Sequence, residues 1–278
     1  MLDEGIAYLA HDSKRQLVAL DTLDLDASPT PPATVVFNNV AVGEIVATAT
    51  QIVASESNRL HLAQKDHLAT IDVVSLPAGE EIVSLAAHGE TIYASTNNRR
   101  LYRVLAGALP VNTYKVVIEN LIGASENNIL NLTVSGDYLF FSEGTNIHRL
   151  DLKTFADTVL ELPDTQAINA LEYADGNLWV AYRTAVASEV RVVDAQTWTL
   201  NEAIRIPLTQ VATSLAKHQS FLAIGLGDSG VQIIDLNGQL PGINPALLTP
   251  TAGSVFVQGD KMTLAPSTTE GINSVRYY

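Results

Sequence analysis

The sequence predicts an all-β protein, and three features of its 278 residues support this fold class. Val, Ile, Thr and Tyr recur in short runs, and the apolar residues do not follow helical spacing. Gly, Asn, Asp and Pro interrupt these runs about every ten residues, as turn residues do between short strands. Hydrophobic residues make up 47% of the chain and charged residues only 17%, so the chain has enough apolar surface to form a core.

Residues 168–194 contain the clearest copy of a repeated unit. An apolar run from Ile168 to Tyr173 ends at an Asp175-Gly176 turn, a second run covers Leu178 to Val180, and a third covers Val190 to Val193. Each run has the length of one strand and is bounded by turn residues. The unit therefore predicts three consecutive antiparallel strands.

The unit recurs with an average period of 43 residues, since 215 residues separate the first and last of six copies. Aligned on the first apolar residue after the turn, the copies begin at Ile6, Leu60, Ile92, Leu139, Leu178 and Phe221. Four-stranded blades arranged around one axis recur at about 40–45 residues, whereas an undivided sandwich has no such period. The period therefore favours a six-bladed β-propeller.

A second landmark supports the repeat. The third strand of five units ends in an apolar residue followed by an aspartate, at Asp21, Asp72, Asp151, Asp194 and Asp235. We expect each aspartate side chain to hydrogen-bond its own turn, which leads into a fourth strand. Fourth strands are predicted at residues 33–37, 114–118, 158–162 and 203–207. The second unit is too short for a clear fourth strand, and prolines after residue 238 discourage one in the sixth.

The strand endings LATID, VRVVD and VQIID, which follow turns such as SGD and ADGN, resemble the bacterial propeller repeats of the YVTN and LVIVD type. The resemblance covers roughly residues 1–240, and we assign residues 1–244 to the propeller. Residues 245–278 resemble the first half of a bacterial Ig-like domain, on Pro250, Gly253, Phe256, Gly259 and the final VRYY. A seventh blade is the alternative for this segment, because Met262 follows Phe221 by 41 residues.

The two ends of the chain raise the question of ring closure. Met1 falls at the second strand of its unit, so we expect the first blade to lack its innermost strand. The tail is too short for a complete Ig sandwich, which needs about 100 residues. We therefore expect residues 254–258 to supply the missing strand.

Charge and composition exclude several classes of partner. Thirty acidic residues against sixteen basic ones give a net charge of -14, which repels nucleic acid and anionic lipid. The absence of cysteine excludes disulfides and thiolate chemistry. No apolar run approaches the roughly 20 residues of a membrane span, and the first residues lack the positive charge of a secretory signal.

Candidate binding residues follow from the propeller geometry, because loops between second and third strands and connections between blades are expected around the mouth of the channel. The predicted ligand-binding residues in within-blade loops are Asp66, Asn98, Arg99, Glu143, Asn146 and Asp228. Those preceding innermost strands are Glu81, Asn128 and Gln210, while Ala49 and Ala167 occupy the same place in other units. Residues 97–100 with Arg103 form the one basic cluster, which could anchor a carboxylate ligand.

The sequence predicts no catalytic residue, metal site or cofactor. One carboxylate and two amides at the innermost positions do not match the six to eight oxygen ligands of calcium. The six histidines lack metal-ligand spacing, and we interpret each as an exposed turn residue. Residues 227–230 match the letters around a chymotrypsin-like serine, but a hairpin loop is expected there.

These observations lead to an expected function. The resemblance implies a non-enzymatic adhesion or binding module of a larger bacterial surface or secreted protein, which recognises a glycan or a protein through the loops of a rigid scaffold. We expect a monomer that binds no nucleic acid and does not insert into a membrane. The alternatives are a propeller hydrolase or lyase with a site at the channel mouth, and an intracellular scaffold.

Overall fold

The computed structural model describes residues 2–3, 6–11, 14–21, 33–66, 68, 70–108, 114–122, 125–218 and 220–236. The segment assigned to an Ig-like domain or a seventh blade, and the strand expected at residues 254–258, lie outside this range. Within the described residues, no helix is long and apolar enough to cross a membrane.

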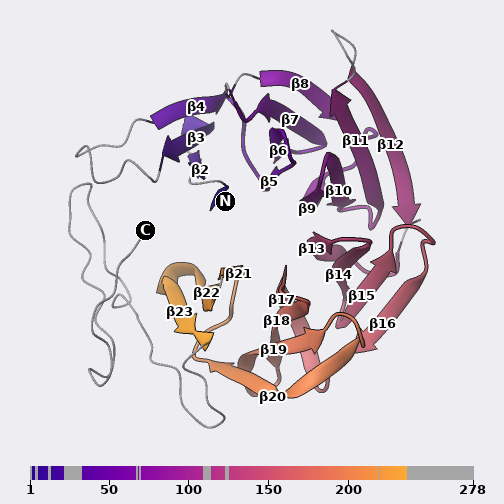
Figure 1. The fold of residues 1–278 in the computed structure, drawn as a ribbon, viewed down its shortest axis with the longest axis vertical. Coiled ribbons are helices and arrows are strands. Elements are labelled where there is room, and N and C mark those ends of the chain that lie inside the picture. The colour runs from indigo at the N-terminus through magenta and orange to yellow at the C-terminus, as the bar shows by residue number, and fades with distance from the viewer. Residues whose placement is uncertain are drawn as a thin grey trace. The chain divides into compact units, whose positions relative to one another are not determined.

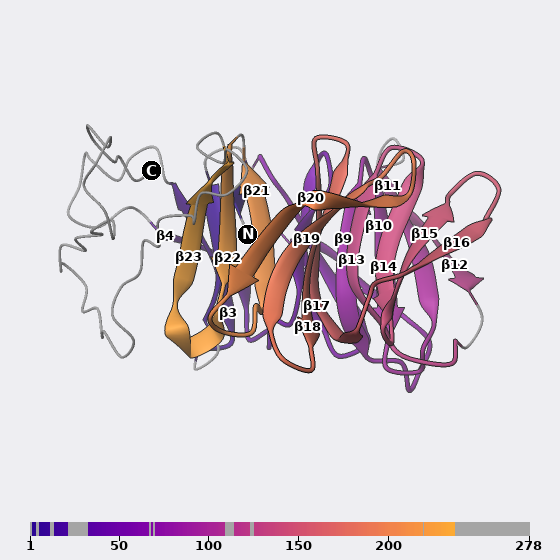
Figure 2. The same cartoon turned by 90° about the horizontal axis from the view of Figure 1, so that it is seen from below.

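The described chain forms two compact units. Of the described residues, the first unit comprises those within 1–139 and 150–156, and the second comprises those within 140–149 and 157–236. Both units are built from antiparallel sheets whose strands follow one another in chain order (Figures 1 and 2).

Three four-stranded sheets lie in the first unit. The first sheet contains β1 (Leu2–Asp3), β2 (Ile6–His11), β3 (Gln16–Asp21) and β4 (Ala33–Asn38). The second contains β5 (Ile45–Ala47), β6 (Gln51–Glu56), β7 (Arg59–Gln64) and β8 (Thr70–Ser75). The third contains β9 (Ile82–His88), β10 (Thr91–Thr96), β11 (Leu101–Ala108) and β12 (Tyr114–Ile122).

Three further sheets follow along the chain. The fourth contains β13 (Ile129–Ser135), β14 (Tyr138–Glu143), β15 (Asn146–Asp151) and β16 (Asp157–Glu161). The fifth contains β17 (Thr165–Ala174), β18 (Asn177–Thr184), β19 (Ser188–Asp194) and β20 (Thr199–Leu208). The sixth has three described strands, β21 (Ser214–His218), β22 (Phe221–Gly225) and β23 (Val231–Asp235).

The core lies between the faces of successive sheets. On β6, Ile52 and Ala54 pack with the first sheet, whereas Val53 packs with the third. Alternate residues of a strand point to opposite faces, so a strand covered on both faces needs apolar residues at consecutive positions. This explains why the inner strands read as unbroken apolar runs. In the second unit, the fifth sheet packs in the same way against Phe140 and Ile147 on one face and against the sixth sheet on the other.

The alignment of the second unit was wrong. Leu60 lies on β7, the third strand of its sheet, and the position that corresponds to Ile92 is Ile52 on β6. With Ile52, the steps become 46 residues from Ile6 and 40 to Ile92, replacing 54 and 32. Both β6 and β7 are buried on both faces, so the local apolar pattern does not distinguish a second strand from a third. The second sheet also has a complete fourth strand, β8, which contains Asp72.

The expectation for the first sheet was also wrong. Leu2 and Asp3 form a short innermost strand, β1, which pairs with β2 through Leu2 opposite Ala7. The first sheet therefore has an innermost strand of its own, formed by Leu2 and Asp3. The four predicted fourth strands are confirmed as β4, β12, β16 and β20, and the sixth sheet has no fourth strand among the described residues.

The aspartates that end β15 and β19 form matching turns, as predicted. Asp151 Oδ1 accepts hydrogen bonds from the backbone N–H groups of Lys153 and Thr154, each at 2.8 Å. Asp194 Oδ1 accepts the equivalent bonds from Gln196 at 2.9 Å and from Thr197 at 2.8 Å. The fifth residue of each turn is aromatic and has a positive φ of 57°, at Phe155 and Trp198. The side chain of the aspartate therefore stabilises a strained turn in both sheets.

Replacing Asp194 by alanine is expected to lower the thermal unfolding midpoint of the fifth sheet near neutral pH. The backbone N–H of Thr197, and then its hydroxyl, lower the pKa of Asp194. A carboxyl with a lowered folded pKa stabilises the protein above its unfolded pKa, and this stabilisation is lost as the pH falls through the folded pKa. The difference in unfolding midpoint between wild type and Asp194→Ala should therefore become smaller in acid. A difference of equal size in acid and at neutral pH would contradict this role. Glu161→Ala, at an exposed position on β16, is the control.

Candidate functional site

In the first unit, two kinds of loops lie side by side: turns between second and third strands, and the connections that lead into first strands. The backbone N–H of Gly43 donates to Ser55 O, that of Ile82 to Ser57 O, and that of Asn97 to Glu81 O, each at 2.9 Å. The N–H of Ser125 donates to Arg99 O at the same distance. We call this surface the loop row, and it comprises residues 41–44, 55–58, 79–82, 96–100 and 125–128.

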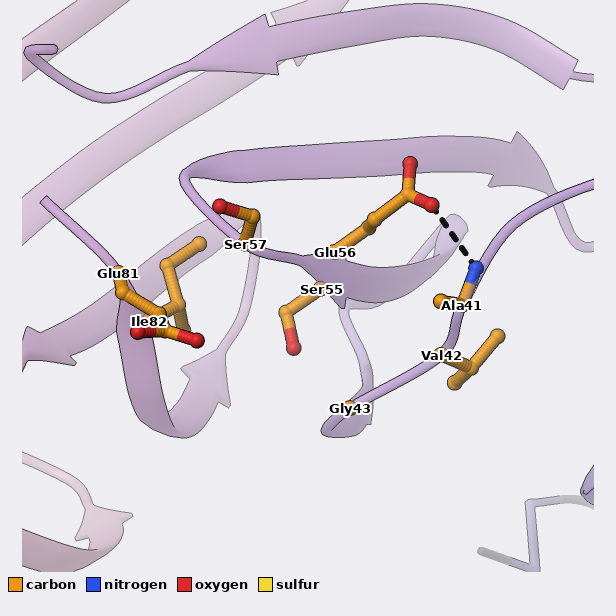
Figure 3. Close-up of a pocket in the computed structure, with 8 residues that line it drawn as sticks. All are labelled: Ala41, Val42, Gly43, Ser55, Glu56, Ser57, Glu81 and Ile82. Atoms are coloured by element: carbon orange, nitrogen blue, oxygen red, sulfur yellow. Dashed lines mark hydrogen bonds between the residues drawn. The ribbon is translucent and has the colours of Figure 1, made fainter. Parts of the chain in front are cut away.

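A cavity of about 420 Å³ opens on the loop row. Figure 3 shows Glu81 and Ile82 on one side, the strip from Ala41 to Gly43 on the other, and Ser55, Glu56 and Ser57 between them. All eight lining residues belong to the first unit and come from three segments. We refer to this cavity as the row pocket.

Glu56 fixes one wall of the row pocket. Its Oε1 atom accepts the backbone N–H of Ala41 at 2.9 Å (Figure 3) and Nη2 of Arg15 at 2.8 Å. Its Oε2 atom lies 3.2 Å from His61 Nε2. The N–H of Ala41 is the largest cause that lowers the pKa of Glu56, so this carboxyl is ionised at neutral pH. The carboxylate of Glu56 is therefore engaged in holding the strip at residues 41–43.

A close approach of two backbones completes the same wall. Ser55 Oγ accepts the backbone N–H of Glu44 at 2.8 Å, and a Cβ atom at position 43 would lie 2.9 Å from that oxygen. A side chain at Gly43 would therefore displace the hydroxyl of Ser55.

The two neighbouring glutamates at the other wall have different surroundings. Glu80 is 4% exposed and accepts hydrogen bonds from Thr96 Oγ1 at 2.5 Å, Arg100 Nη1 at 2.9 Å and Tyr102 O–H at 3.1 Å. Burial opposes the charge on Glu80, but these hydrogen bonds outweigh burial and lower the pKa of Glu80. Glu81 is exposed, and its Oε2 atom lies 3.5 Å from Asn97 Nδ2. Glu80 thus anchors the loop row, and Glu81 presents a carboxylate at the row pocket.

Four of the predicted binding residues lie on the loop row. Glu81 lines the row pocket, and Asn128 is exposed immediately before β13. Asn98 Nδ2 donates to Gly79 O at 2.9 Å, and Arg99 Nη1 donates to Glu126 O at 2.6 Å. Asn98 and Arg99 thus tie neighbouring segments of the row together, while Glu81 and Asn128 are exposed at the ends of connections that lead into first strands.

Asp66 does not lie on the loop row, which corrects the prediction that it belongs to a loop between second and third strands. It lies in the turn after β7, the third strand of its sheet, because the second unit was misaligned. Asp66 and Ala49 line a second cavity of about 370 Å³, together with Ile6, Tyr8, Thr50, Gln64 and Lys65. Ala49 itself lies between β5 and β6 and does not precede a first strand.

The remaining predicted residues belong to the second unit. Glu143 and Asn146 flank the turn between β14 and β15. Gln210 is exposed in the connection before β21, and Asp228 is exposed in a 3₁₀ turn, Gly227–Ser229, between β22 and β23. This placement confirms that residues 227–230 form a hairpin loop.

Two buried histidines were missed, and the interpretation of every histidine as exposed was wrong. His61 and His148 are 9% and 7% exposed, whereas His88 and His218 are exposed at the ends of β9 and β21. His148 Nδ1 lies 2.8 Å from Asp157, its Nε2 lies 3.6 Å from Glu143, and its ring stacks on Phe141 with a centroid distance of 4.8 Å.

A sequence signal for these histidines exists. Ser-Glu at the end of a second strand is followed by an apolar-His pair on the third, at residues 55–61 and again at residues 142–148. The repeat therefore places a carboxylate beside a buried imidazole in two sheets. No group of three or more His, Asp or Glu side chains in the described part of the chain is arranged to hold a metal ion.

Comparison with known proteins identifies the fold and no family. No family model matches the sequence. No curated protein matches it either. Among solved structures, a chain of a mitotic checkpoint complex is similar with a TM-score of 0.64 and 9% identity, over 83% of this chain and 72% of that one.

Two further solved structures are similar. The Pan2 WD40 domain of Neurospora crassa has a TM-score of 0.64 and 12% identity, over 90% of this chain and 77% of that one. The computationally designed Ika8 protein has a TM-score of 0.58 and 14% identity, over 92% of this chain and 77% of that one. Together with the succession of three- and four-stranded antiparallel sheets, these likenesses show that the chain has a β-propeller fold.

Proposed function

We propose that this protein is a non-enzymatic binding module that recognises a glycan or a protein through the loop row of its first unit. The observation that carries the proposal is the row pocket, which presents the exposed carboxylate of Glu81 between segments held by backbone hydrogen bonds. Its volume of about 420 Å³ is in the range of small ligand sites.

The hydrogen bonds that hold the walls of the row pocket in place favour a binding function. Glu56 and Glu80 are buried or half-buried anchors that keep the two walls in place. Loops that are already ordered lose little conformational freedom when a ligand binds, so more of the contact energy appears as affinity. The exposed side chains of the loop row can be replaced by other residues without disturbing the sheets beneath them.

The wider assignment is part of the same proposal. Six sheets in chain order and the period of 43 residues support six blades. The YVTN- and LVIVD-like strand endings support a bacterial surface or secreted protein, and the letters of residues 245–278 support a partial Ig-like segment with a seventh blade as its alternative. We propose that the chain acts as a monomeric part of a larger protein.

Substituting Glu81 and Asn128 together by alanine is expected to reduce ligand binding several-fold without a loss of stability. Both side chains are exposed, so their removal should change the free energy of unfolding by less than about 0.5 kcal/mol. Glycan and peptide arrays probed with labelled wild-type and variant protein would measure binding, and urea unfolding would measure stability.

The control is Glu161→Ala, at an exposed position on β16 outside the loop row. Array signals that persist unchanged in the double variant would place binding elsewhere. A loss of stability that accounts for the loss of binding would also argue against the proposal.

A further inference from the structure

We propose that the row pocket accepts the cationic side chain of a lysine or arginine from a basic peptide. This inference rests on the proposed binding function and names its class of partner. It follows from which charges on the loop row are already paired and from the apolar character of the pocket walls.

Glu81 is the carboxylate of the row pocket that is open to a ligand. Glu56 is paired with Arg15 and with the N–H of Ala41, and Glu80 is paired with Arg100. Arg99 Nη1 donates to a backbone carbonyl at Glu126. Beside Glu81 in the pocket stands the exposed hydroxyl of Ser57, which can accept a hydrogen bond from a cation.

The walls fit the stem of such a side chain. Val42 and Ile82 line opposite sides of the row pocket (Figure 3), and none of its eight described lining residues is aromatic. Lysine and arginine place their methylene groups along apolar surface and keep the charged end among polar groups. A sugar ring would lack the flat aromatic surface against which its apolar face can stack. The pocket therefore favours an aliphatic stem with a positive end over a glycan.

The whole chain adds long-range attraction for the same partner. With a net charge of -14, it attracts basic segments and repels acidic ones over roughly 8 Å at physiological salt. Binding should consequently weaken as salt is added.

The test uses fluorescently labelled peptides in which glycine alternates with lysine, with arginine or with acetyl-lysine. Fluorescence anisotropy with the full chain would give the affinity at low salt and near physiological salt. The lysine or arginine peptide should bind, and the acetyl-lysine peptide should bind more weakly because it keeps the stem but lacks the charge. Glu81→Gln should weaken binding roughly two- to five-fold, the usual effect of one exposed charge pair.

Glu161→Gln is the matched control, because Glu161 is exposed on β16 and lies outside the loop row. Equal affinity of wild type and Glu81→Gln, or equal binding of the acetylated peptide, would overturn the inference. Loss of glycan-array binding in Glu81→Gln without any binding of basic peptides would also overturn it, while leaving the proposed function in place. If no array ligand depended on the loop row, both this inference and the proposed function would be contradicted.

Discussion

Replacing Glu189 by alanine is expected to destabilise the fifth sheet by about 3–5 kcal/mol, because it breaks a buried ionic network and leaves a charge behind. Glu189 is 2% exposed, accepts a hydrogen bond from Tyr182, and pairs with Arg191 and Arg205. Burial opposes its charge, yet the hydrogen bonds from Tyr182 and Arg205 outweigh burial and lower the pKa of Glu189. Without Glu189, the buried guanidinium of Arg191 loses its buried partner.

Tryptophan fluorescence during urea unfolding would measure this effect locally. The chain has two tryptophans, and both belong to the fifth sheet or its turns: Trp179 on β18 and Trp198 between β19 and β20. Glu202→Ala is the control, because Glu202 also pairs with Arg191 but its side chain is 76% exposed, and it should cost less than about 1 kcal/mol. If Glu189→Ala cost no more than this control, the network would not be a stabilising element.

Replacing Glu172 by glutamine is expected to stabilise the protein at pH 8 and to have little effect near pH 4. Burial on β17 raises the pKa of Glu172 from 4.5 to about 7, although the backbone N–H of Lys217 acts in the opposite direction. Since the folded pKa is raised, the folded state holds this proton more tightly than the unfolded state. Wild-type stability should therefore fall as the pH rises from about 4.5 to 7.

The size of this effect follows from the same shift. A change in the pKa of Glu172 from 4.5 to about 7 corresponds to at most about 3 kcal/mol in the free energy of unfolding at pH 8. Glu172→Gln would recover this stability, because the glutamine amide has no charge to bury. Chemical unfolding followed by tryptophan fluorescence at a series of pH values would measure it. Glu161→Gln, at the exposed position on β16, controls for general effects of charge. If the free energy of unfolding changed with pH in the same way for wild type and Glu172→Gln, Glu172 would not be the titrating group.

The repeat was readable from the sequence because turns and aspartates recur at similar intervals. Asp151 and Asp194 show why: each makes the same local hydrogen bonds within three residues, and such local contacts leave a local signature. The second sheet was misassigned because β6 and β7 are both covered on two faces, and their apolar runs look alike without knowledge of their neighbours.

The candidate site was predictable only in part. The sequence correctly placed Glu81 and Asn128 immediately before first strands, because the repeat predicts where those strands begin. The row pocket was not predictable, because its opposite wall at residues 41–43 depends on the close approach of Gly43 to Ser55. Asp66 was misplaced together with its strand.

The sequence by itself determined the fold class, the repeated sheets and most of their loops, since strand periodicity and turn chemistry act over a few residues. The tertiary structure alone decided which polar residues are buried anchors and which face solvent. Glu80 and Glu81 are adjacent and chemically identical, yet one is buried beneath Arg100 and Tyr102 while the other faces solvent. That difference arises from contacts between residues about 20 positions apart, and the burial they create sets the cost of each charge.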